Sequence, residues 1–179
     1  MRKYLIVVAI VGALATFAHA QVFPWIEEGT REFLLEGDWD PKGTTGTEIE
    51  LSAGYGFFLR DLFEVGGLLS YASYEDAGGP GVDSKSWGLS GFAEYHFDVL
   101  NAALPYVGAR IGYVDTEEAS WDKTAFVYGP RAGIKYFIAD NIAIDAALEY
   151  MFATEDIFTN EGEHEDSDLS LKFGIRTMF

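Results

Sequence analysis

The sequence contains no cysteine, and this absence removes several classes of protein. A chain without thiols has no disulfide scaffold, no cysteine-ligated metal centre, no thiol catalysis and no lipid attached through an N-terminal cysteine. Its 179 residues suit a single domain. That domain must therefore be stabilised by buried side chains or by a closed network of backbone hydrogen bonds.

Basic residues are also scarce. The chain has 12 Lys and Arg against 29 Asp and Glu, which gives a formal net charge of −17 at pH 7. Nucleic-acid binding depends on a basic surface that neutralises phosphates. We therefore expect no nucleic-acid partner.

The first residues have the pattern of a secretory signal peptide. Arg2 and Lys3 precede an apolar run, and an A-x-A cleavage motif ends at Ala20. A transmembrane anchor is the alternative, but about 14 apolar residues span roughly 21 Å, short of the roughly 30 Å hydrocarbon core. We expect a signal peptide over residues 1–20, an N-terminal lead-in over 21–28 and a barrel domain over 29–179.

Long apolar runs are absent after residue 20, so a mature chain that enters a membrane must do so as strands. The remaining sequence alternates apolar and polar residues in short runs, which are separated by turn-rich or acidic stretches. This period of two predicts eight strands, near residues 30–39, 47–58, 63–74, 85–97, 105–114, 125–137, 142–153 and 168–179.

One face of the predicted strands is bulky and apolar, whereas the other is small or charged. Phe33, Leu89 and Tyr150 are typical of the first face, and Gly112 and Ser170 of the second. A soluble lipocalin-like barrel would place the apolar face inside, but the interior of an eight-stranded barrel is only just wide enough for side chains to fill. We therefore predict an all-β fold, an eight-stranded antiparallel up-and-down transmembrane β-barrel whose bulky face contacts lipid.

The predicted connections alternate in length. Those after the second, fourth and sixth strands are short, whereas the others are longer, and residues 115–123 and 154–167 are strongly acidic. Outer-membrane barrels have short periplasmic turns and longer extracellular loops. Because the strand number is even, we expect both termini on the periplasmic side of the outer membrane.

Pro130 does not suit its position inside the sixth predicted strand. Proline cannot donate a hydrogen bond to a neighbouring strand, and a closed barrel has no free edge. We expect a bulge or broken pairing around Gly129 and Pro130.

Charges on the inward face should be paired, because an unpaired charge in a narrow barrel is costly. The last strand is assumed to close on the first in simple register, which barrel stagger can shift. The expected pairs are Lys135 with Asp145 and Arg131 with Glu149 across the sixth turn, Arg176 with Glu32 and Lys172 with Glu36 across the closing seam, and Arg110 with Glu94 across the fourth turn.

This interior charge network has two interpretations. In the first, it fills and rigidifies the lumen. In the second, it gates a narrow ion path that opens when a pair such as Arg131 and Glu149 separates.

Candidates for catalysis and metal binding have little support in the sequence. His96 lies on the inward face two residues from Glu94, and His164 lies in an acidic stretch with Ser167 and Asp168 nearby, but no spacing fixes a catalytic geometry. The acidic loops offer oxygen ligands for Ca²⁺ or Mg²⁺ without matching a calcium-binding motif. We predict no enzymatic activity, no cofactor and no metal site.

Three segments, LPYVGARIGY (104–113), AGIKYFIADNIAIDAALEY (132–150) and LSLKFGIRTMF (169–179), resemble the small outer-membrane β-barrel superfamily that includes OmpA-like and OmpX-like barrels. The resemblance implies insertion by the barrel assembly machinery, which reads Phe173, Ile175 and Phe179 in the last strand. It also implies outer-membrane lipid and lipopolysaccharide as surroundings, and we expect a monomer. The implied role is structural or surface-interacting with acidic extracellular loops, and the alternative is a narrow porin-like channel for ions or small solutes.

Overall fold

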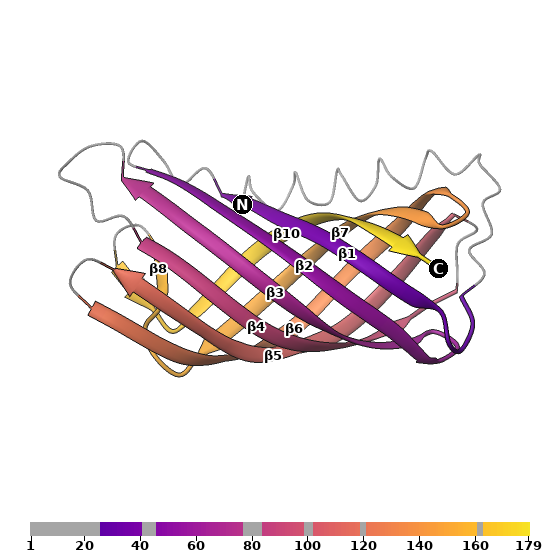
Figure 1. Ribbon diagram of the computed structural model, residues 1–179, viewed down its shortest axis with the longest axis horizontal. Helices are drawn as coiled ribbons and strands as arrows, with labels where there is room; N and C mark the ends of the chain where they lie inside the picture. Colours follow the sequence, from indigo (N-terminus) through magenta and orange to yellow (C-terminus); the bar gives the residue numbers. More distant parts are fainter. Residues whose placement is uncertain (1–25, 41–45, 77–83, 99–101, 119–120, 161–162) are drawn as a thin grey trace, which may run out of the picture.

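The computed structural model shows one closed antiparallel barrel with steeply tilted strands (Figure 1). It describes residues 26–40, 46–76, 84–98, 102–118, 121–160 and 163–179. Eight strands close in the order β1-β10-β7-β6-β5-β4-β3-β2, which confirms the predicted fold class. They are β1 (Arg31–Asp40), β2 (Gly46–Arg60), β3 (Phe63–Asp76), β4 (Ser84–His96), β5 (Ala103–Glu118), β6 (Trp121–Ala139), β7 (Ile142–Ala153) and β10 (Ser167–Met178).

The predicted signal peptide and most of the lead-in, residues 1–25, lie outside the described residues. Within the described part of the chain, no helix has the length and apolar character needed to cross a membrane.

The two ends of the barrel differ in their connections. At one end, where the C-terminus lies (Figure 1), β2 and β3 are separated only by Asp61 and Leu62, and β6 and β7 only by Asp140 and Asn141. We call this the short-turn end. At the opposite end, a second small sheet formed by β8 (Phe158–Asn160) and β9 (Glu163–Glu165) lies in the sequence between β7 and β10.

The prediction of a loop over residues 115–123 is wrong for most of this segment. β5 continues to Glu118 and β6 begins at Trp121, and the two strands remain paired up to these residues. Strand pairing therefore continues through an acidic stretch, because cross-strand hydrogen bonds do not depend on apolar side chains. Polarity alone does not mark the end of a strand here.

Burial alternates along each strand as predicted. On β7 it switches at nearly every residue, with Asp145 and Glu149 buried and Ile144 and Leu148 exposed. The outer face carries large apolar side chains with about half of their surface exposed. They include Phe33, Leu35, Leu51, Leu69, Leu89, Ile111, Tyr113, Tyr128, Phe173, Ile175 and Phe179.

The inner face is bulkier than predicted. Besides charged and small residues, it holds buried aromatic side chains at Phe58, Phe92, Tyr106 and Phe137. Neighbouring glycines make room for some of them. A Cβ added at Gly133 would lie 2.6 Å from Cζ of Tyr106, which is closer than real side chains approach. Glycine on the inner face therefore does not widen the lumen, because a large neighbour fills the space.

Pro130 interrupts strand pairing without a bulge. β6 pairs with β7 on both sides of Gly129 and Pro130 in one unchanged register, but neither residue pairs with β7. On its other side, β6 pairs continuously with β5 through both residues. The expected break is present, and the single register shift between β6 and β7 lies elsewhere, between Phe137 and Ala139.

β10 closes the barrel against β1 in a register two residues away from the expected one. Arg176 lies opposite Leu34 instead of Glu32, and Lys172 lies opposite Asp38 instead of Glu36. A shift of two keeps every side chain on its predicted face. The seam ends with Arg31 and Phe179, which exchange two backbone hydrogen bonds of 3.0 and 2.9 Å.

An apolar cluster fills the lumen at the short-turn end. Leu104, Phe137, Ala143 and Met178 are all at least nine-tenths buried and in contact with one another. Ile26 from the segment before β1 and Leu62 from the turn between β2 and β3 pack against them. The barrel interior is thus capped by hydrocarbon at this end, and the charged layers lie behind the cap.

Candidate functional site

The interior charge network is the candidate functional site. All ten predicted members are buried inside the barrel, with at most 4% of each residue's surface exposed. Glu64, His96 and Tyr106 were not predicted as members, but they are buried among them. The ten predicted residues are Glu32, Glu36, Glu94, Arg110, Arg131, Lys135, Asp145, Glu149, Lys172 and Arg176.

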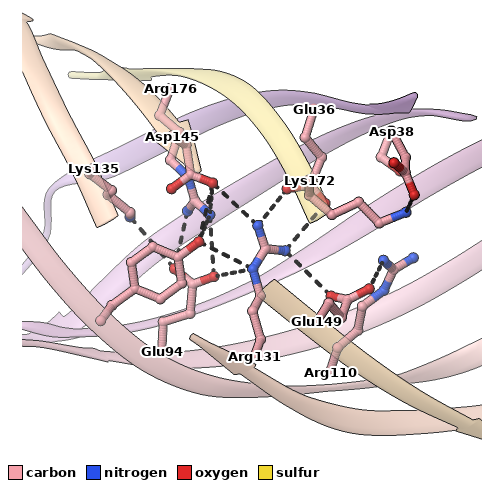
Figure 2. Close-up of polar contacts among 12 residues, drawn as sticks. Glu36, Asp38, Glu94, Arg110, Arg131, Lys135, Asp145, Glu149, Lys172 and Arg176 are labelled. Carbon is pink, nitrogen blue, oxygen red and sulfur yellow. Dashed lines mark hydrogen bonds and ion pairs between the residues drawn. The ribbon is translucent and has the colours of Figure 1, made fainter. Parts of the chain in front are cut away.

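Arg131 on β6 lies at the centre of this network, as Figure 2 shows. Its Nη1 and Nη2 donate to the two carboxylate oxygens of Glu36 at 3.2 and 2.5 Å, a bidentate arrangement that suits guanidinium. Further carboxylate oxygens lie 3.4 Å away on Asp145, 3.5 Å on Glu94 and 3.7 Å on Glu149. One guanidinium therefore links four carboxylates from three strands, β1, β4 and β7.

The predicted register of β6 and β7 is confirmed, but it does not determine the principal partners. Arg131 is opposite Glu149 and Lys135 is opposite Asp145, as expected. Arg131 nevertheless makes its shortest contact across the lumen with Glu36, and Glu149 accepts from Arg110 at 3.1 Å. In a narrow barrel, long side chains reach the far wall, so cross-lumen partners compete with neighbours on the sheet.

Tyr106 on β5 joins three charged groups through its hydroxyl. The hydroxyl donates to Asp145 at 3.1 Å and accepts from Arg131 Nε and Arg176 Nη2, each at 3.2 Å. Its ring also lies under the Arg176 guanidinium, 5.2 Å from centroid to Cζ. The alternation of the sequence could have placed this residue, because Tyr106 lies two and four residues before Gly108 and Arg110 and therefore shares their inward face.

Two further cations, Lys135 and Arg176, form a charged layer next to the apolar cap together with the carboxylates that they bind. Lys135 Nζ donates to Glu32 at 2.7 Å and to Glu64 at 2.8 Å. Arg176 Nη1 donates to Glu32 at 2.6 Å and to Glu94 at 3.1 Å. The predicted contact between Arg176 and Glu32 is therefore made in spite of the shifted register.

His96 on β4 lies within this layer. Its Nδ1 is 3.2 Å from the carbonyl oxygen of Leu62, and its backbone N–H donates to the same oxygen at 2.8 Å. Its Nε2 has no hydrogen-bond partner and lies 3.7 Å from Glu64 and 3.6 Å from Glu94.

Towards the end of the barrel opposite the short turns, the expected partners of two cations, Lys172 and Arg110, are wrong. Lys172 contacts Glu50 at 2.5 Å and Asp38 at 3.5 Å rather than Glu36, because the closing register places it opposite Asp38. Arg110 is diagonal to Glu94 across β4 and β5, as predicted, but its ion pair is with Glu149. Figure 2 shows Lys172 with Asp38 and Arg110 with Glu149, both close to Arg131.

Other residues considered from the sequence fall partly outside the described side chains. The side chain of His164 is among those not described, so no catalytic geometry follows for it. Asp115 and Glu117, which the sequence assigned to a loop but which lie in β5, and Glu155 and Asp156, which follow β7, are exposed to solvent. Phe173, Ile175 and Phe179, the predicted assembly signal, lie on the outer face with 47%, 56% and 56% of their surface exposed.

A closed, antiparallel, eight-stranded barrel with an apolar outer face and a charged, filled interior defines the class of small membrane β-barrels. Residues 6–177 match the family described as outer membrane protein beta-barrel domain. The chain belongs to this family.

Individual proteins are also similar to this chain. An uncharacterized protein of Haemophilus influenzae is 27% identical over 192 residues, covering 99% of both chains. The N-terminal β-barrel domain of Pseudomonas aeruginosa OprF matches with a TM-score of 0.53 and 21% identity, covering 85% of this chain and 98% of its own. The outer membrane protein OprG of the same organism has a TM-score of 0.58 at 13% identity, covering 88% and 99%. At these identities the two solved structures show a shared fold.

Proposed function

We propose that this protein is a non-enzymatic outer-membrane barrel with a structural and surface-interacting role. The observation that carries the proposal is the filled interior. Its largest fully buried side chains include Arg176, Tyr106, Phe58 and Lys135, which come from different strands and occupy the same cross-section of the barrel.

The apolar cap strengthens this proposal against a conducting channel. Leu104, Phe137 and Met178 close the short-turn end with hydrocarbon, and the charged layer behind it is held by ion pairs of 2.6 to 3.1 Å. An ion path would require both layers to rearrange. Separation of Arg131 from Glu149 alone would leave Arg131 bound to Glu36 and would open nothing.

Conductance in planar lipid bilayers tests the proposal. We expect no discrete ion conductance from the wild-type protein and none from Glu149→Ala, since Glu149 lies outside the cap. Arg60→Ala, a change at an exposed turn-side residue, is the matched control for handling and insertion. Stepwise conductance in the wild type that changes in Glu149→Ala but not in Arg60→Ala would favour the channel and overturn the structural role.

We further propose that both termini face the periplasm and that the acidic long loops face outward, where outer-membrane lipid and lipopolysaccharide are the neighbours. The pattern of short turns at one end and longer connections at the other supports this orientation. A monomer inserted by the barrel assembly machinery, with Phe173, Ile175 and Phe179 as its signal, is consistent with a seam that closes within one chain. Protease accessibility in intact cells tests the orientation, and cleavage within the short turns rather than the long loops would contradict it.

A further inference from the structure

The layer around His96, counted together with the Arg131 cluster that adjoins it, carries more negative than positive formal charge. It contains five carboxylates, Glu32, Glu36, Glu64, Glu94 and Asp145, and three cations, Arg131, Lys135 and Arg176, all buried. With every carboxylate ionised, the formal charge of this layer is −2. A negative charge of this size in a low-dielectric interior is costly unless a further cation or protons compensate it.

His96 presents a free nitrogen to this layer. The carbonyl oxygen of Leu62 accepts from His96 Nδ1 at 3.2 Å, and this contact assigns the imidazole proton to Nδ1. Nε2 then carries the lone pair, has no hydrogen-bond partner, and lies 3.7 and 3.6 Å from carboxylate oxygens of Glu64 and Glu94. A histidine fixed by Nδ1–H to a backbone carbonyl is the usual arrangement for a metal ligand.

The two carboxylate oxygens of Glu64 differ in their contacts. Lys135 binds its Oε2 at 2.8 Å, but its Oε1 is buried without a hydrogen-bond partner. A buried carboxylate oxygen without a partner is unusual in a folded protein. The oxygen that lies 3.7 Å from His96 Nε2 is Oε2, however, so a metal ion bound there shares this oxygen with Lys135.

The spacing of the three groups suits one small cation. One ligand atom from each of Glu64, Glu94 and His96 lies within 4.8 Å of the others. Ligands at about 2.0–2.1 Å from a tetrahedral Zn²⁺ are ~3.4 Å apart, and His96 Nε2 lies 3.6 and 3.7 Å from the two carboxylates.

We propose that His96, Glu64 and Glu94 form a binding site for one divalent first-row transition metal ion, with Zn²⁺ as the representative. One imidazole and two carboxylates are a ligand set that such ions accept. The charge of +2 offsets the formal charge of −2 in the layer. Because the site lies behind the apolar cap, the ion enters while the barrel folds and not by diffusion into the finished barrel.

Refolding in the presence of metal tests the proposal. The full chain is refolded into detergent micelles with Co²⁺ or Zn²⁺, passed over a chelating resin and analysed for metal content. We expect about one metal ion per folded chain and visible Co²⁺ absorption typical of a low-coordinate site. Addition of the same metal to the already folded barrel should give much less retained metal.

Two histidine variants separate a specific site from adventitious binding. His96→Asn removes Nε2 but retains a donor near the Leu62 carbonyl, and it should reduce metal content to background. His164→Asn removes the other histidine of residues 21–179 and should leave metal content unchanged. Equal metal content in wild type and His96→Asn, or background metal in a folded wild type, would overturn the site.

Glu64→Gln provides a second variant if His96→Asn fails to fold, as judged by its gel mobility before and after boiling. Glutamine still accepts from Lys135 but lacks the charge, so Co²⁺ absorption should be lost in a folded protein. Retention of the wild-type spectrum in folded Glu64→Gln would also overturn the proposal.

Discussion

At the scale of single residues, stability depends on cations that each serve several carboxylates. Arg131 contacts carboxylates of Glu36, Glu94, Asp145 and Glu149, and its side chain is fully buried. Removal of such a cation leaves several buried negative charges without compensation. Buried pairs are costly to form but far more costly to break on one side only.

We predict that Arg131→Gln destabilises the barrel by about 3–5 kcal/mol. Unfolding by urea in detergent micelles, followed by tryptophan fluorescence, measures the change. Arg60→Gln, at an exposed position, should change stability by less than about 0.5 kcal/mol. The double variant Arg131→Gln/Glu36→Gln should lose less free energy of unfolding than the sum of the losses of the two single variants, because the two groups are in direct contact. Strict additivity would contradict the assigned pair.

At the scale of elements, the fit between β5 and β6 depends on glycine beside a large inward side chain. A Cβ at Gly133 would lie 2.6 Å from Tyr106 and 2.7 Å from the carbonyl oxygen of Ala146. By contrast, a Cβ at Gly91 on β4 would meet only the carbonyl oxygen of Gly66, at an ordinary 3.7 Å. The two positions therefore differ in packing although both are strand glycines.

Gly133→Ala should destabilise the barrel by about 1–3 kcal/mol, because the added methyl group overpacks the site. Gly91→Ala is the matched control and should be neutral or stabilising by up to about 1 kcal/mol, since alanine restricts the unfolded chain. Urea unfolding midpoints of the two variants, compared with wild type, give the answer. Equal losses at both positions would mean that close approach to Tyr106 does not determine the cost.

At the scale of elements, too, the sequence predicted some features and missed others for physical reasons. Strand positions and faces follow from alternation, which each segment carries locally. The β6–β7 register follows from a short turn at Asp140. The register between β1 and β10 could not be predicted in this way, because no turn joins these two strands. The stagger of the barrel sets their register. The ion-pair partners of Arg131 and Lys172 were not predicted for the same reason, because they depend on the closing register and on which strands face each other across the lumen.

At the scale of the whole molecule, the barrel has an apolar exterior and a charged interior, the inverse of a soluble protein. Large side chains such as Leu89 and Tyr113 expose 67% and 62% of their surface, whereas Arg176 and Lys135 expose none. Burial of that exterior in lipid is the arrangement expected for a membrane barrel.

A folded barrel closed by hydrogen bonds should resist detergent until it is heated. We therefore predict that the protein, extracted from membranes in mild detergent, migrates differently on a denaturing gel before and after boiling. Before extraction, the protein should remain with the membrane fraction after a high-salt wash, because apolar contact holds it there. Release into the soluble fraction, with identical mobility before and after boiling, would contradict the membrane assignment.

The paired backbone of Arg31 and Phe179 has a consequence for chain connectivity. Because the first and last strands meet at one end, a short linker could join Phe179 to Gly29, and new ends could be opened between Glu118 and Trp121. Such a circular permutant would keep all eight strand pairs while placing Phe179 in the middle of the chain. If cellular insertion requires a free terminal aromatic residue, the permutant will fold in detergent yet fail to reach the membrane. Successful insertion would instead show that the machinery recognises the strand and not the chain end.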